Sequence, residues 1–173
     1  MSFISELKQF VPCRVCLACD GCCRFRRPDS VWQPHLTPQE IGALKNQAVE
    51  RILSAEGRVP TVPHQDFFIC HFFSPAHNAC GIYHARPFEC SLYPFLLTKT
   101  DSGMALSVHL LCPYVMEKKD SLAWRQHILY LQDFFAREDV RAFLQRYPQL
   151  AADYSQSGQE MEKVFNLNPA TRT

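Results

Sequence analysis

The spacing of apolar residues predicts a first amphipathic helix in "LTPQEIGALKNQAVERILSAEG". Apolar residues recur there every three or four positions, at Ile41, Leu44, Ala48 and Ile52. Thr37 and Glu40 form a T-x-x-E capping box, Pro38 suits the first helical position, and Gly57 is a typical stop. We therefore predict a helix over residues 37–55.

The pattern becomes helical again from Glu117 onward. One predicted apolar face contains Leu122, Ile128, Leu129 and Phe135. A second contains Val140, Phe143, Leu144 and Tyr147, and Pro148 ends it. These faces predict a helical C-terminal part over residues 117–166, with a frayed tail after Asn166.

Between these helices, residues 59–112 contain short β-prone runs separated by proline and glycine. The runs at 67–69, 82–83 and 94–98 are predicted strands, and "LLTKTDSGMALSVHL" is typical of a hairpin that turns at Asp101-Ser102-Gly103. The whole pattern predicts one α+β domain over residues 1–173. Its helices flank a loop-rich, cysteine-bearing middle that includes a short β-hairpin.

Composition narrows the classes of function. Apolar residues make up 47% of the chain and charged residues 20%, which is typical of a globular protein, and the formal net charge is +1. This balance gives no electrostatic reason for a nucleic-acid partner. The sequence has neither the apolar core of a signal peptide nor about 18 consecutive apolar residues, so we expect a cytoplasmic protein without a membrane partner.

The nine cysteines are the main chemical signal. Cytoplasmic thiols are kept reduced, and nine is an odd number, so the count favours metal binding over disulfides.

Five of these cysteines lie in "CRVCLACDGCCR", residues 13–24. Two-residue gaps separate Cys16, Cys19 and Cys22, and such gaps let a tight turn direct sulfurs at one metal. Cys22 and Cys23 are adjacent, so their side chains tend to diverge; one could bind a second metal, bridge two metals or remain a free thiol. Cys13 continues the two-residue spacing, and the sequence is compatible with two roles for it, a metal ligand or a plain thiol.

The other cysteines form a second group. Cys70, Cys80 and Cys90 are ten residues apart, and Cys112 precedes a proline, as the last ligand of many iron–sulfur loops does. This group has no pair of cysteines two residues apart that could begin a site of its own. We therefore predict that the two groups meet at one shared site.

Other side chains near the second group could take part. Four histidines could bind metal or donate hydrogen bonds to ligands, although histidines in aromatic-rich segments are more often structural: His71, His77, His84 and His109. The positive charge of Arg86 would offset thiolate charge and lower the thiol pKa, or it could bind a carboxylate.

Together these residues resemble the CxxCxxCC family of zinc- or iron-chelating cysteine-cluster domains, the YkgJ type. The resemblance covers about residues 13–113 and includes the first box, the T-x-x-E helix start and "CGIYHARPFECSLYPF". It implies a metal-binding region with eight ligands: Cys16, Cys19, Cys22, Cys23, Cys70, Cys80, Cys90 and Cys112. Arg86, Tyr83 and His84 lie close to these cysteines in the sequence, and we predict that they contact the ligands. Cys13 is outside the pattern, and Ser91 stands where the family often has arginine, which would weaken a contact to the ligands.

The leading hypothesis is a metalloprotein that holds an iron–sulfur cluster or zinc, because thiolates suit both. A [4Fe–4S] cluster needs only four thiolates and would leave four for a second site or for structure. One alternative is a cluster-dependent enzyme for redox chemistry or methyl transfer, since the flagellin lysine N-methylase carries a similar cluster. Another is a structural zinc module that presents a partner-binding surface. The sequence contains no glycine-rich nucleotide loop or H-x-x-E-H signature, and it assigns no catalytic residue and no partner.

Overall fold

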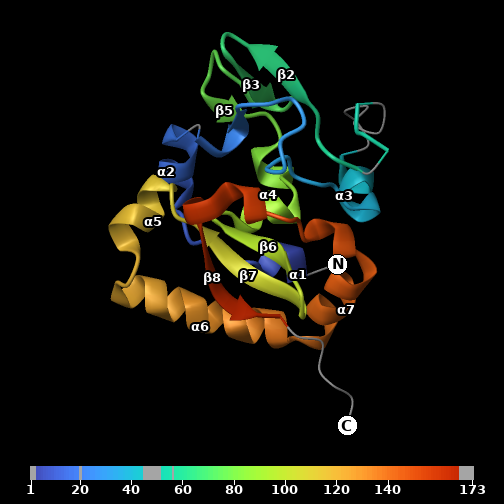
Figure 1. Ribbon diagram of the computed structural model, residues 1–173. Helices are drawn as coiled ribbons and strands as arrows, with labels where there is room; N and C mark the ends of the chain where they lie inside the picture. The colour runs from blue at the N-terminus through green and yellow to red at the C-terminus, as the bar shows by residue number, and fades with distance from the viewer. Residues whose placement is uncertain (1–2, 20, 45–51, 56, 168–173) are drawn as a thin grey trace. The chain divides into compact units, whose positions relative to one another are not determined.

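Helices and short antiparallel strands alternate along the chain, which confirms the α+β class. The computed structural model describes residues 3–19, 21–44, 52–55 and 57–167, with the side chains of 157–159 left out. The chain forms two compact units, shown as a ribbon in Figure 1 and each described here by itself. Unit 1 consists of Met1–Val11 and Leu92–Thr173, and unit 2 is Pro12–Ser91. No helix in the described ranges is both long enough and apolar enough to cross a membrane.

A three-stranded antiparallel sheet is the centre of unit 1. Its strands are β6 (Phe95–Thr100), β7 (Gly103–His109) and β8 (Met161–Asn166), in the order β6-β7-β8. The predicted hairpin is confirmed, because Thr100 pairs with Gly103 and the glycine has a φ of +127°. Strand β8 was not predicted: residues 161–166 were expected to be helical. These residues are extended because they pair with β7, more than 50 residues earlier in the chain, and such a distant partner leaves little signal for a strand in the local sequence.

The helices of unit 1 are α1 (Phe3–Glu6), α5 (Pro113–Lys118), α6 (Leu122–Ala136) and α7 (Glu138–Arg146). The predicted apolar face of α7 is confirmed, since Val140, Phe143, Leu144 and Tyr147 are buried. A short 3-10 turn, η5 (Pro148–Leu150), follows α7, and another, η6 (Ser155–Glu160), precedes β8.

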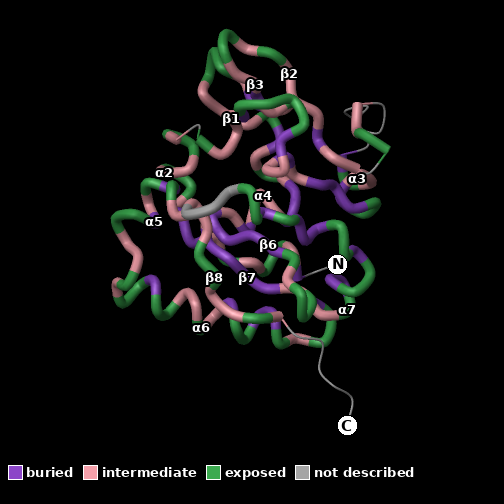
Figure 2. Tube along the Cα trace, in the orientation of Figure 1, coloured by how far each residue is buried: buried purple, intermediate pink, exposed green. Residues whose placement is uncertain are grey.

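The predicted apolar face of α6 is confirmed at Phe135, which is buried, and is wrong at Leu122 and Leu129. Leu122 is 67% exposed and Leu129 is 61% exposed. The side chains buried on α6 are Trp124, Leu131, Phe134 and Phe135. Burial and exposure alternate along this helix in Figure 2. Its aromatic residues pack on the sheet, with ring centroids 5.3 Å apart for Trp124 and Phe95, because they bury more apolar area than the leucines would.

Unit 2 contains two small sheets. Strands β1 (Arg24–Phe25), β2 (Thr61–His64) and β3 (Phe67–Cys70) form one in the order β1-β3-β2, and β4 (Phe73–Ser74) pairs with β5 (Ala79–Cys80). The strand predicted at 67–69 is confirmed as β3. The strand predicted at 82–83 is wrong: Ile82 caps a 3-10 turn, η4 (Tyr83–Ala85), and its carbonyl accepts from Ala85 N–H at 2.8 Å.

Short helices connect these sheets: α2 (Cys13–Ala18), η1 (Gly21–Cys23), α3 (Pro38–Ala43) and α4 (Phe88–Leu92). The capping box that begins α3 is confirmed, with both of its hydrogen bonds present. The predicted extent of this helix is not. Leu44 caps α3, residues 45–51 lie outside the described residues, and residues 52–55 are not helical. The predicted tail lies mostly outside the described residues as well.

Backbone pairing explains why the segment before Gly57 departs from its helical pattern. Leu36 N–H donates to the Gly57 carbonyl at 2.8 Å, and Val59 N–H donates to the Pro34 carbonyl at 2.9 Å. Gly57 has a φ of +80°, and a Cβ there would lie 2.9 Å from the Leu36 carbonyl oxygen. These tertiary contacts need a turn at Gly57 and outweigh the local periodicity.

Candidate metal centre

The first cysteine box is shaped by a single helical turn and the 3-10 turn after it. Pro12 precedes α2, and its carbonyl accepts from the N–H groups of Val15 and Cys16 at 2.9 and 3.0 Å. Cys19 caps the helix through its N–H, 3.2 Å from the Cys16 carbonyl. Turn η1 then carries Cys22 and Cys23. Helix α2, its cap and turn η1 therefore carry all five cysteines of this box.

The second group of thiols lies on three other elements of unit 2. Cys70 ends β3, Cys80 ends β5 opposite Phe73, and Cys90 lies in the middle of α4. Helix α2 contacts β5, so the two groups are brought together by tertiary packing. Figure 1 shows α2 beside β5 within unit 2.

Electrostatic interactions link thiols of the two groups. Cys16 is hydrogen-bonded to Cys22, and Cys80 interacts electrostatically with Cys16. Cys90 interacts with Cys22 of the first group and with Cys70 and Cys80 of the second. We call the seven thiols of unit 2 that take part the thiol cluster: Cys16, Cys19, Cys22, Cys23, Cys70, Cys80 and Cys90. Cys112 belongs to unit 1, where it is buried and caps α5.

Burial and mutual repulsion hold the cluster in its protonated form. Desolvation raises the pKa of Cys90 well above the usual value and raises that of Cys70 to about 11. The hydrogen bond with Cys22 is the largest cause that raises the pKa of Cys16, followed by burial. The hydrogen bond with Cys16 lowers the pKa of Cys22. The hydrogen bond with Cys23 and burial outweigh this effect, so the pKa of Cys22 lies above its usual value. Ionisation of several of these thiols therefore needs a compensating positive charge.

Arg86 and Tyr83 supply polar contacts within the cluster. The Arg86 guanidinium lies over the Tyr83 ring, 4.1 Å from its centroid, and its charge opposes the rise in pKa of Cys16 and Cys80. Burial, and next the interaction with Cys13, raise the pKa of Tyr83 to about 12. The phenol oxygen is buried, and this contact lacks the geometry of a normal hydrogen bond.

Ser91, which stands where the family often has arginine, contacts Arg86. Its Oγ accepts from Arg86 Nε at 3.3 Å. The residue that departs from the family pattern therefore helps to hold the arginine.

Three of the four candidate histidines are exposed side chains of unit 2. His84 is exposed and packs edge-on against Tyr83, and His71 is exposed against Phe72. His77 is exposed as well, and its Nδ1 lies 3.0 Å from Ser74 Oγ. His109 is in unit 1, where its Nδ1 lies 2.8 Å from the Tyr93 hydroxyl.

A buried polar network that the sequence analysis missed supports α4. The Glu40 carboxylate accepts from Phe88 N–H at 2.5 Å and from both the N–H and the hydroxyl of Thr37 at 2.7 Å. His35 N–H donates to Glu89 Oε2, and burial raises the pKa of Glu89. The capping box was the available signal for Glu40, but a box alone does not show that its carboxylate reaches a second helix. Through these contacts, α4 is fixed with Cys90 directed into the cluster.

The donor set fits zinc or iron. Both metals bind thiolate sulfur, and either cation would neutralise the negative charge of the ionised thiols. In the described residues, no three Cys, His, Asp or Glu side chains already have a metal-binding geometry. The residues present fit zinc or iron by the chemistry of their thiols.

Comparison with known proteins identifies the family. Residues 15–127 match the CxxCxxCC family model, described as a "putative zinc- or iron-chelating domain". The chain belongs to the CxxCxxCC family. No curated protein and no solved structure matches it. Membership of the CxxCxxCC family supports zinc or iron binding, and the matched range includes all eight predicted ligands but not Cys13.

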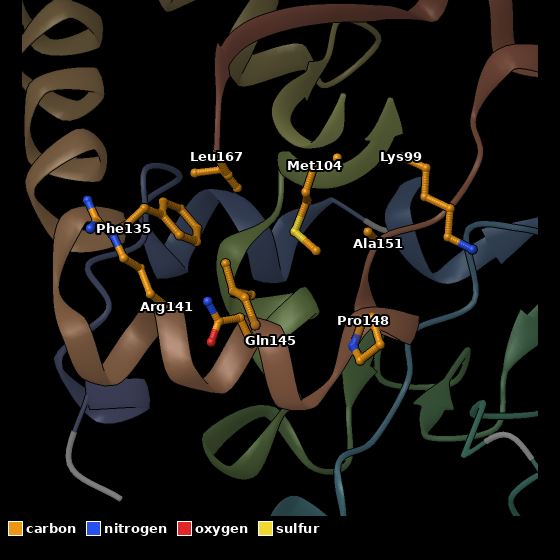
Figure 3. A pocket seen from close by; sticks show the side chains of 10 residues that line it. Lys99, Met104, Phe135, Arg141, Gln145, Pro148, Ala151 and Leu167 are labelled. Atoms are coloured by element: carbon orange, nitrogen blue, oxygen red, sulfur yellow. The ribbon is translucent and has the colours of Figure 1, made fainter. Parts of the chain in front are cut away.

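The pocket of unit 1 has no thiol in its lining. It has a volume of about 340 Å³ and opens between the hairpin and α7. Figure 3 shows Met104, Phe135 and Leu167 on one side and Gln145 and Pro148 on the other. None of the cysteines that the family match covers lies in this lining.

Proposed function

We propose that this protein is a metal-binding protein that holds an iron–sulfur cluster, or zinc, through its cysteine thiolates. The observation that carries the proposal is the convergence of thiols from α2 and η1 with those of β3, β5 and α4. Four thiolates suffice for a [4Fe–4S] cluster, so seven converging thiols are more than enough.

The ligand set that we propose is the thiol cluster together with Cys112, which rests on the sequence alone. The cytoplasmic setting is part of the same proposal, because these thiols must stay reduced to bind metal. When bound, an iron–sulfur cluster would supply electron transfer, and zinc would supply a structural cross-link.

The chain's own residues have defined tasks in this proposal. The thiols give up protons when metal binds, and the positive charge of Arg86 stabilises the thiolates that form. Phe88, two residues before Cys90, is buried, and so is Phe73, which pairs with Cys80 between β4 and β5. These two rings limit the access of water to the thiols. Exclusion of water is one of the ways in which a protein tunes the potential of a cluster.

Anaerobic purification followed by iron, zinc and acid-labile sulfide analysis tests the proposal. We expect iron and sulfide in equal amounts and thiolate-to-iron absorption near ~400 nm. Zinc at fixed stoichiometry without absorbance would replace the iron–sulfur form by the zinc form and would favour a structural module. Co-purified S-adenosylmethionine would favour a methyl-transferring enzyme. Absence of both metals from the anaerobic protein would refute metal binding.

A further inference from the structure

Cys13 lies beside the thiol cluster although it falls outside the family match. It is the first residue of α2, three positions before Cys16, and side chains with this spacing lie on one face of a helix. All nine cysteines are in the described ranges, and Cys13 is the exposed one among them. The helix therefore presents one thiol to solvent next to another that belongs to the cluster.

Tyr83 connects these two thiols. Its phenol interacts with Cys13 and also with Cys16, and Arg86 lies over its ring. The two cysteines therefore approach the same side chain from one helix face.

Beyond Cys16, the thiols continue inward as a series of contacts. Cys16 is partly exposed and hydrogen-bonded to Cys22, and Cys22 interacts with Cys90, whose burial is the main cause of its raised pKa. A thiophilic ion that moves between neighbouring thiols never has to lose all of its sulfur ligands at once.

We propose that Cys13 is the exchange thiol of this protein, the residue that accepts a metal ion from an external thiol- or chelator-bound donor and passes it to Cys16. This proposal rests on the proposed metal-binding function. The Cys13 thiol loses its proton to solvent and forms a bond to the metal as one donor–metal bond breaks. The Cys16 thiol then loses its proton and displaces Cys13, which takes up a proton again. The oxidation state of the metal does not change.

The test measures how fast the metal-free, reduced protein takes Zn²⁺ from its complex with a chromophoric chelator. We expect Cys13→Ser to slow uptake at least about tenfold while the final zinc content and affinity stay at the wild-type values. Cys13→His should restore most of the rate, because imidazole also binds zinc. Leu17→Ser, an exposed change on the same helix, is the matched control and should not alter the rate.

The outcomes separate this proposal from the proposed function. An unchanged rate in Cys13→Ser overturns the exchange role, and so does a loss of bound zinc in that variant, because Cys13 would then be a permanent ligand. A slow rate that Cys13→His does not improve also overturns it, since packing would then explain the effect. If the wild-type protein takes up no zinc and contains no metal as isolated, the proposed function itself fails.

Discussion

Among single residues, Arg86 has the widest influence on the thiol cluster. Its guanidinium contacts Tyr83 and Ser91, and its charge acts on Cys16 and Cys80. The serine and the aromatic ring hold this cation in place. The thiols around it therefore ionise more easily than burial alone would allow.

We predict that Arg86→Met weakens zinc binding at neutral pH by about tenfold for each unit of thiol pKa that the lost charge restores. Arg86→Lys keeps the charge and should retain most of the affinity. Competition with a chelator of known affinity measures both variants. Equal affinity of Arg86→Met and the wild type would show that the guanidinium has no electrostatic role.

At the scale of elements, the link between α3 and α4 explains how Cys90 is positioned. Glu40 caps α3 and at the same time accepts the first N–H of α4, so one buried carboxylate joins two helices. Neither helix is long enough to be stable alone, and their mutual contacts stabilise both.

Removal of this carboxylate should therefore affect both stability and metal content. We expect Glu40→Ala to reduce the free energy of unfolding by about 2–4 kcal/mol, because Phe88 N–H and the Thr37 donors are left unsatisfied in a buried place. Gln39→Ala, an exposed change on α3, should stay within about 0.5 kcal/mol of the wild type. Urea unfolding and zinc content are the measurements. A wild-type unfolding midpoint in Glu40→Ala would contradict the role of this link.

The residues of α6 give a pH dependence that is independent of the cysteines. His127 stacks on Phe95 with centroids 5.6 Å apart and lies near Tyr130 and Lys8. Burial, and then the charge of Lys8, lower its pKa from 6.5 to about 4. Between pH 6.5 and pH 4, His127 is therefore protonated in the unfolded chain and neutral in the folded chain. The free energy of unfolding consequently falls as the pH drops through this range.

We expect His127→Leu to remove this part of the acid sensitivity. The experiment compares urea midpoints of the variant and the wild type at pH 7 and pH 4.5. The wild-type midpoint should fall more between the two pH values than that of the variant. Parallel changes in both proteins would mean that His127 titrates normally in the fold.

The elements also show which features can be predicted from sequence and which cannot. The capping box at Thr37, the hairpin turn at Gly103 and the face of α7 are local signals, and the structure confirms them. The error on α6 arose because a leucine stripe competes with aromatic residues that bury more area, and only the sheet decides between them. The turn at Gly57 and strand β8 depend on partners distant in the sequence, and local patterns do not contain that information. That the two cysteine groups share one metal site stays a prediction, which rests on the lack of a close cysteine pair in the second group.

For the whole molecule, the two units differ in what stabilises them. Unit 1 contains a sheet covered by aromatic residues, including Phe95, Trp124 and Phe134. Unit 2 has a small apolar core around Leu36, Val59 and Ile82, with Cys70 and Cys80 packed against it. A unit with such a core depends more strongly on a bound metal for its stability.

We predict that metal removal under reducing conditions loosens unit 2 and leaves unit 1 folded. Amide hydrogen exchange should quicken in β3 and α4 while β6 and β7 stay protected. Cys19→Ala and Cys22→Ala should lower the metal content and have the same regional effect, whereas Cys13→Ala should do much less. Equal loss of protection in both units would contradict the prediction.

The order of the chain through the two units has a consequence for synthesis. Phe3 packs against Phe143, with centroids 5.1 Å apart, so unit 1 needs both the first and the last parts of the chain. At 5–20 residues per second, the ribosome takes roughly 7–28 s to pass from one of these phenylalanines to the other. All the thiols of unit 2 emerge within that interval. Nascent chains therefore meet the cell's metal supply with the cysteine unit already synthesised and unit 1 still incomplete.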